Sequence, residues 1–177
     1  MTGKEFINAL ANGKSDIIQL ILDILSETDS PYCLIGGLAV NAYVEPVVSL
    51  DLDIVAAVEH IGAICTAARG RGLTVEDFED SVNISSPDSE VRVQLQTDPR
   101  YQTFLSTAAD NDVLGYRMKV ATVENVLQGK ASAYLDKTRR RSKRQKDLAD
   151  ILRIIEAYPQ LEASLPQGVR EDLQRIE

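Results

Sequence analysis

The sequence is poor in the residues that build disulfide frameworks, metal clusters and stacking surfaces. It contains two cysteines, one histidine and no tryptophan, and aromatic residues make up 5% of it. Cys33 and Cys65 have neither CxxC spacing nor histidine neighbours, so we expect two buried thiols rather than a disulfide or a zinc site. The single histidine, His60, excludes a multi-histidine metal site, and we expect it at the surface or at a helix cap. The scattered aromatic residues do not form a pattern typical of a base-stacking platform.

Long apolar runs are also missing. No segment approaches the roughly 18 apolar residues that cross a bilayer, and the amino end lacks a basic-then-apolar signal, so we expect a cytoplasmic protein without membrane contact. The 177 residues, 44% hydrophobic and 26% charged, suit one globular domain. We predict a single domain over 1–177, with its core at about 15–121 and a helical carboxy-terminal part at about 122–177.

Positive charge is concentrated in one segment. The net charge is −8, yet Lys137 to Lys146 (KTRRRSKRQK) holds seven basic residues and no acidic one. Such a run is either a solvated helix face or a contact for polyphosphate or nucleic acid. A protein this acidic does not coat duplex DNA, because non-specific binding needs many distributed phosphate contacts.

Hydrophobic spacing predicts an α+β fold. Helical periodicity, with Ser15 and Thr122 as N-caps, indicates helices at about 16–26, 38–43, 61–69, 99–109, 122–135 and 139–158. Alternating or short apolar runs indicate strands at 32–35, 49–58, 73–78, 81–84, 90–97 and 114–120. Strands dominate the middle and helices both ends, which favours a mixed β-sheet covered by helices.

Two short patterns carry the chemistry. Ile35-Gly36-Gly37 ends a predicted strand, and Asp51-Leu52-Asp53 follows on another, where both carboxylates share one face. Neighbouring carboxylates repel each other unless they share a cation, and Mg²⁺ is the natural candidate. Glycines without side chains let backbone N–H groups approach a phosphate closely. The alternative is that the glycines only end a strand and the aspartates line a solvated edge.

The segments CLIGGLAVNAY and SLDLDIV together resemble the nucleotidyltransferase superfamily, which includes the DNA polymerase β-like enzymes. The chain is most similar to small bacterial AbiEii-type proteins of toxin–antitoxin systems. The resemblance implies a nucleotidyltransferase-like fold in which Gly36 and Gly37 bind a nucleoside triphosphate and Asp51 and Asp53 are the catalytic, Mg²⁺-binding residues. It also implies transfer of a nucleoside monophosphate to an acceptor hydroxyl on RNA, protein or a small molecule, and a possible toxin or antitoxin partner.

The chain departs from that family at two places. Relatives carry a third acid on a later strand, whereas the polar face of 91–96 presents Arg92, Gln94 and Gln96; Glu90 is the nearest acid on that face. A glutamine cannot take a proton at neutral pH. Relatives also carry a basic residue and a threonine before the carboxylates, where this chain has Val47 and Ser49. The alternative function is therefore a catalytically impaired protein that binds a nucleotide or a partner.

Later residues add candidate phosphate contacts. Lys130 projects from an otherwise apolar helical stripe, so we expect it either to meet an anion or to extend along the border of the stripe to water. Arg139 and Arg140 are candidates for gripping a triphosphate, and an RNA-binding adaptor that uses 139–146 is a third possible function. Asp147 and Asp150 either fix their helix to the sheet or form pairs with Lys143 and Lys146 within it.

Overall fold

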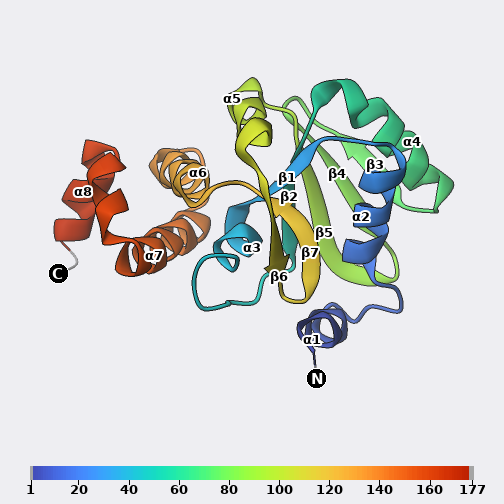
Figure 1. Cartoon of the computed structure of the whole chain (residues 1–177), viewed down its shortest axis with the longest axis horizontal. Coiled ribbons are helices and arrows are strands. Elements are labelled where there is room, and N and C mark those ends of the chain that lie inside the picture. The colour runs from blue at the N-terminus through green and yellow to red at the C-terminus, as the bar shows by residue number, and fades with distance from the viewer. Residues whose placement is uncertain (1, 176–177) are drawn as a thin grey trace.

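The computed structural model describes residues 2–175 and contains one mixed seven-stranded sheet (Figure 1). The strand order is β3-β4-β5-β2-β1-β7-β6. The strands are β1 (Tyr32–Ile35), β2 (Asp51–Ala56), β3 (Thr74–Asp77), β4 (Ser81–Ser86), β5 (Ser89–Gln96), β6 (Ala109–Val113) and β7 (Tyr116–Val120). β2 runs antiparallel to β1 and parallel to β5, and β1 runs parallel to β7. The expected α+β class with a mixed sheet is confirmed.

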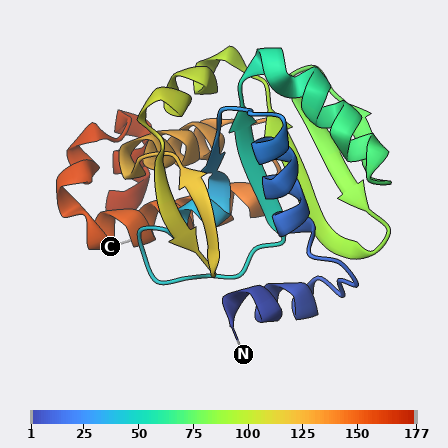
Figure 2. The same ribbon diagram turned by 45° about the vertical axis from the view of Figure 1, so that its right-hand side comes forward.

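Helices cover both faces of the sheet. The α-helices are α1 (Gly3–Leu10), α2 (Ile17–Glu27), α3 (Gly36–Val40), α4 (Ile61–Gly70), α5 (Pro99–Gln102), α6 (Val123–Leu135), α7 (Arg141–Ala157) and α8 (Gln167–Gln174); 3₁₀ turns span Val58–His60, Thr103–Thr107 and Pro159–Ser164. α2 and α4 lie together on one side of the sheet, and α6, α7 and α8 lie on the other (Figures 1 and 2). The predicted helical carboxy-terminal part contains α6 to α8; Met1 and residues 176–177 of the predicted domain lie outside the described residues.

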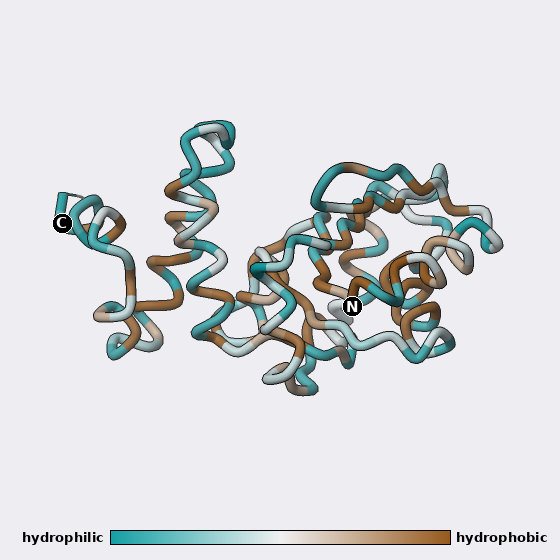
Figure 3. The backbone as a smooth tube through the Cα atoms, turned by 90° about the horizontal axis from the view of Figure 1, so that it is seen from above, coloured by the Kyte–Doolittle hydropathy of each residue, from teal (hydrophilic) through white to brown (hydrophobic). Residues whose placement is uncertain are grey.

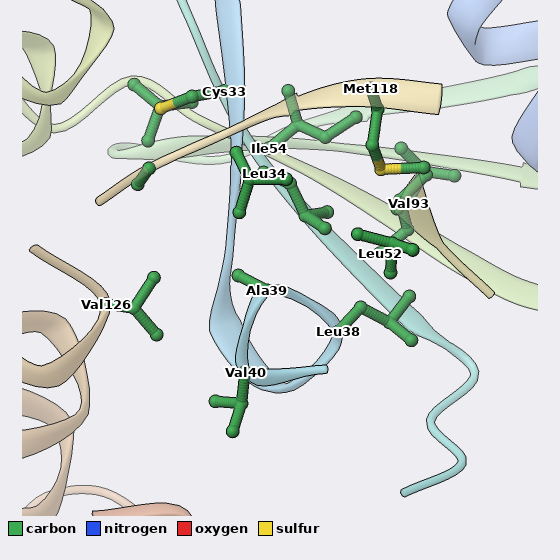
Figure 4. Packing of buried hydrophobic residues seen from close by; sticks show 14 of the residues in the cluster. Cys33, Leu34, Leu38, Ala39, Val40, Leu52, Ile54, Val93, Met118 and Val126 are labelled. Atoms are coloured by element: carbon green, nitrogen blue, oxygen red, sulfur yellow. The ribbon is translucent and has the colours of Figure 1, made fainter. Parts of the chain in front are cut away.

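The alternation along β2 creates the two environments that matter for function. Leu52 and Ile54 are fully buried, whereas Asp51 and Asp53 on the opposite face keep partial exposure. Figure 4 shows Leu52 and Ile54 among buried side chains of β1, β5 and β7, with the short helix α3 close by. Burial of this apolar set fixes the register of β2, because a shift by one residue would turn both carboxylates into the core.

Along the helices, hydrophobic residues alternate with hydrophilic ones instead of forming long uninterrupted apolar runs (Figure 3). Within residues 2–175, no helix combines the length and the apolar character that a bilayer crossing requires. Cys33 and Cys65 are buried and unpaired, as expected.

Several local predictions were wrong. Asp16, not Ser15, caps α2, since its Oδ1 accepts from the backbone N–H of Gln19 at 3.0 Å. The helix predicted over 99–109 is only α5 and a 3₁₀ turn, and the chain continues into β6. This strand pairs with β7 through the two-residue turn Leu114-Gly115, in which both residues have positive φ. Neither α1 nor β6 was predicted.

Candidate active site

The diglycine lies at the junction of β1 and α3, and its first glycine cannot be replaced without strain. Gly36 has φ +73°, in the left-handed region that side chains disfavour. A Cβ atom at Gly36 would lie 2.2 Å from Oδ2 of Asp53. A Cβ at Gly37 would meet its nearest neighbours only at 3.9–4.0 Å. The sequence therefore needs Gly36 because the Asp53 carboxylate packs directly against its backbone.

Asp53 is partly exposed, like Asp51, but its carboxylate lies deeper in the site, against the backbone of Gly36. Its register partners are Ile35 on β1 and Gln94 on β5. No residue in the described part of the chain donates a hydrogen bond to its carboxylate, and burial raises its pKa despite the charge of Lys130. Asp53 therefore presents unshared oxygen atoms inside an enclosed, positively charged site.

Asp51 is held by two cations. Nε of Arg92, on β5, lies 2.8 Å from Oδ1, and Nζ of Lys143, on α7, lies 3.1 Å from Oδ2. Burial by itself would raise the pKa of Asp51, but the Lys143 hydrogen bond and the charges of Lys143 and Arg92 outweigh it and lower that pKa. Asp51 is thus ionised, with both oxygens neutralised by the chain's own cations.

A buried ion-pair cluster connects α6 with α7 beside the carboxylates. Lys130 is 7% exposed, and its Nζ lies 3.0 Å from Asp147 Oδ1 and 2.7 Å from Asp150 Oδ2. Nε of Arg139 donates to Asp147 Oδ2 at 2.8 Å, and Arg153 pairs with Asp150. Lys130 therefore meets anionic partners inside the protein instead of extending to water. The alternative helical pairs Lys143–Asp147 and Lys146–Asp150 do not form.

Three adjoining cavities meet at this point, and Asp53 and Arg139 line all of them. The aromatic cavity, of about 130 Å³, is lined by Ile35, Gly36, Asp53, Gln94, Gln96, Tyr101, Phe104, Asn125, Val126, Gly129, Lys130, Ala133, Arg139 and Asp147. The groove, of about 410 Å³, is lined by Asp51, Asp53, Glu76, Asn83, Ile84, Ser85, Arg92, Val93, Gln94, Arg139 and Lys143. The cationic cavity, of about 30 Å³, is lined by Gly37, Ser49, Asp51, Asp53, Lys130, Arg139, Lys143, Lys146 and Asp147.

The structure brings together most, but not all, of the candidate residues. Gly36, Gly37, Lys130 and Arg139 all line the cavities with the two carboxylates. Arg140 lines none of these three cavities; it is exposed at the residue that precedes α7. Sequence reasoning missed Arg92 and Lys143 as partners of Asp51.

The strand next to β2 presents an amide, Gln94, beside Asp53. Gln94 lies beside Asp53 in the parallel β2–β5 pairing and donates from Nε2 to Ser81 Oγ at 3.2 Å. Glu90 lies four residues earlier on β5, about 13 Å along the strand, and lines none of the three cavities. Glu76 lines the groove, but two strands separate it from β2. Asp51 and Asp53 are thus the neighbouring carboxylates that the sheet places at this site.

The carboxylate pair suits a hard divalent cation. Mg²⁺ prefers oxygen ligands and is usually bound by one or two carboxylates together with water and substrate phosphates. The unshared oxygens of Asp53 next to Asp51 match that requirement. Within residues 2–175, no group of three or more histidine, cysteine, aspartate or glutamate side chains is arranged to hold a metal. Any cation here would therefore need ligands from solvent or substrate.

Comparison with known proteins places the fold. No family model and no curated protein matches the sequence. The antibiotic-resistance factor ANT(2'')-Ia superposes with a TM-score of 0.61 at 13% identity, over 90% of each chain. The lincosamide adenylyltransferase LnuA gives 0.57 at 12% identity, over 81% of this chain and 99% of its own. An antigenic nucleotidyltransferase-like protein from Paracoccidioides brasiliensis gives 0.54 at 19% identity, over 79% and 74%. At these identities the likeness establishes a shared nucleotidyltransferase fold.

Proposed function

We propose that this chain, on its nucleotidyltransferase fold, is a Mg²⁺-dependent nucleotidyltransferase that moves a nucleoside monophosphate from a nucleoside triphosphate to an acceptor hydroxyl. The observation that carries the proposal is the pair Asp51 and Asp53, beside Gly36, where three cavities of different chemistry adjoin. Each cavity suits one part of the reaction.

The aromatic cavity suits the nucleobase, because Tyr101 and Phe104 offer ring surface and Gln96 and Asn125 offer amide groups. The cationic cavity, of about 30 Å³, is too small to enclose a triphosphate, but Lys130 and Lys146 line it next to the backbone of Gly37, so it suits contact with phosphate oxygens at its mouth. The groove, which is open and polar, suits the acceptor.

The residues of the chain have separate roles in the proposed reaction. Asp51 and Asp53 would hold Mg²⁺, which would supply neutralisation of the charge on the transferring phosphoryl group. Arg139 uses Nε to bind Asp147, so its two Nη groups are available to donate to phosphate oxygens. Lys130, fixed by Asp147 and Asp150, adds a positioned positive charge. The hydroxyl oxygen of an acceptor in the groove would attack the α-phosphorus in line, the bond between the α-phosphorus and the oxygen that bridges to the β-phosphate would break, and pyrophosphate would leave. The hydroxyl proton would pass to solvent in the open groove.

The comparisons bear on the chemical class of the acceptor. ANT(2'')-Ia has been seen in complex with adenylyl-2''-tobramycin and LnuA with lincomycin, which favours a hydroxylated small molecule over RNA or protein. An RNA adaptor built on the basic run has less support. Within that run, Arg139 binds Asp147, Lys143 binds Asp51, and Arg144 donates to the carbonyl of Tyr134. These three side chains are engaged within the protein.

A second candidate function rests on Gln94. With an amide beside Asp53, this chain would bind the nucleotide without turnover, as a sensor or as a partner in a toxin–antitoxin pair of AbiEii type. Turnover by the native sequence would remove this candidate.

Calorimetric titration with Mg²⁺ and ATP tests the leading proposal without knowledge of the acceptor. We expect nucleotide binding that falls at least tenfold in Asp53→Asn, because an amide oxygen is a weaker ligand than a carboxylate. Asp23→Asn on the opposite face of the sheet is the matched control and should bind as the wild type does. Release of pyrophosphate from ATP in the presence of an acceptor would then separate turnover from binding. Equal binding by both variants would refute the assignment of the carboxylates.

A further inference from the structure

The structure places a cation of the chain on each oxygen of Asp51. Arg92 occupies Oδ1 at 2.8 Å and Lys143 occupies Oδ2 at 3.1 Å. A divalent cation that bound Asp51 would have to share or replace one of these contacts, and sharing is costly because the two positive charges on one carboxylate oxygen would repel each other. Either Arg92 or Lys143 would therefore have to leave Asp51 when the divalent cation binds.

The cavities distinguish the two cations. Lys143 lines the cationic cavity together with both carboxylates, Gly37 and Lys130, whereas Arg92 lines only the groove. Lys143 therefore borders the space on the phosphate side of the carboxylate pair. Its side chain has a flexible four-carbon stem and an ammonium group with freely rotating donors, so it can change partner without movement of α7.

The contact is weak enough to exchange. The side chains of Lys143 and Asp51 are 41% and 27% exposed, in contrast to 8% and 3% for Lys130 and Asp147. Solvent screens an ion pair at such exposure, and removing one changes an equilibrium by about fivefold at most. Lys130 is a fixed charge by the same reasoning, since its partners are buried and removal of one would leave an uncompensated charge.

We infer that Lys143 is an exchangeable counter-ion: it neutralises Asp51 in the nucleotide-free protein and transfers to the triphosphate when a divalent cation and nucleotide bind. This inference rests on the proposed function and assigns a role to a residue outside the glycine and aspartate patterns. The exchange keeps Asp51 charge-paired in both states. It also gives the incoming phosphates an ammonium group that is already at the cavity wall.

The inference predicts effects of opposite sign from one substitution. In Lys143→Met, affinity for Mn²⁺ without nucleotide should rise about two- to fivefold, because a competitor for Asp51 is gone. In the same variant, affinity for a non-hydrolysable ATP analogue at saturating Mn²⁺ should fall about tenfold, because a charge-assisted contact to phosphate is lost. A merely structural lysine would not move the two affinities in opposite directions.

Three variants serve as comparisons. Arg92→Met should also raise Mn²⁺ affinity but leave affinity for the ATP analogue unchanged, since Arg92 does not line the cationic cavity. Lys137→Met removes a lysine of the same basic segment that forms none of the ion pairs described, and it should change neither affinity. Lys143→Arg preserves the charge, so its affinities for Mn²⁺ and for the ATP analogue should both lie closer to those of the wild type than the affinities of Lys143→Met do.

Mn²⁺ binding is followed by electron paramagnetic resonance and analogue binding by calorimetry, so neither readout depends on turnover. Asp53→Asn separates the possible failures. Two results would show that the carboxylate pair is not a cation site: no Mn²⁺ binding by the wild type, or Mn²⁺ binding by Asp53→Asn that is as tight as that of the wild type. Either result would refute both the proposed function and this inference. If that binding is present but Lys143→Met leaves it unchanged or weakens it, only the exchange is refuted. Unchanged affinity for the analogue in Lys143→Met would refute the transfer to phosphate.

Discussion

At the scale of single residues, the two adjacent glycines have different physical duties. Gly36 combines positive φ with direct contact to the Asp53 carboxylate, so backbone conformation and steric exclusion both demand glycine. Gly37 has neither constraint and lies one residue into α3, with space for a methyl group. The sequence alone does not distinguish the two glycines, although only Gly36 is required by the backbone conformation and by its contact with Asp53.

Substitution by alanine should reveal the difference. We expect Gly36→Ala to lower the free energy of unfolding by about 3 kcal/mol, because it adds left-handed strain to a steric clash with Asp53. Gly37→Ala should change it by less than about 1 kcal/mol, since its new contacts are of ordinary length. Urea denaturation of the two variants checks this. Equal losses would show that the conformation of Gly36 is not what the fold requires.

At the scale of secondary-structure elements, the strongly periodic segments could be predicted and the locally atypical ones could not. Four elements appear near their expected bounds: β1, β2, β5 and α6. The strands have a clear apolar pattern, and α6 has a recognisable N-cap, Thr122. β6 has the sequence ADNDV, whose polar residues disfavour a strand, and its turn at Leu114-Gly115 lacks the usual asparagine. Pairing with β7 decides its conformation instead.

The packing of α1 and α2 against β7 depends on Tyr116. Its hydroxyl donates to Asp16 Oδ1 at 2.8 Å and accepts from Asn8 Nδ2 at 3.2 Å, so one side chain connects three elements. We expect Tyr116→Phe to cost about 1.5 kcal/mol of stability, because hydrogen bonds to a charged group are stronger than neutral ones. Thermal or urea unfolding measures the loss. Tyr101→Phe is the control, since the Tyr101 hydroxyl has no hydrogen-bond partner within residues 2–175; a similar loss in both would contradict the assignment.

At the scale of the whole molecule, the sequence could indicate that Asp51 and Asp53 lie near the glycines, but not which cations neutralise the charge of Asp51. The strand pattern places Asp51 and Asp53 on one face, and the position of the glycines after β1 predicts their proximity. Lys143 and Arg92 join the site only through the packing of α7 and the parallel pairing of β2 with β5. No spacing along the chain encodes either contact, and Lys143 is four residues from Asp147, which suggested a pairing within the helix.

The protein should lose stability at alkaline pH. Burial raises the pKa of Cys33 from 9.0 to about 12, and burial also raises the pKa of Tyr32, Tyr43, Tyr101, Tyr116 and Tyr134 above 10.0. Above pH 9 the unfolded chain therefore releases protons that the native chain keeps, so raising the pH favours unfolding.

Urea midpoints measured from about pH 8 upward check this, and we expect them to fall progressively above pH 9. Cys33→Ala will be less stable overall, but its midpoint should fall less steeply between pH 9 and about pH 12, because it lacks the thiol. The same slope in both proteins would show that Cys33 does not contribute.

The loop between α3 and β2 is anchored from two sides. The Asn41 side chain exchanges hydrogen bonds with the backbone of Val47 at 2.8 and 2.9 Å, and the Tyr158 hydroxyl donates to the carbonyl of Tyr43 at 3.3 Å. The spacing between Gly36 and Asp53 is therefore maintained by strand pairing and by these anchors rather than by the length of the connection. Exposed Val48, which follows the anchored Val47, is therefore a position where the chain can be lengthened while the anchors and the geometry around the carboxylates are preserved.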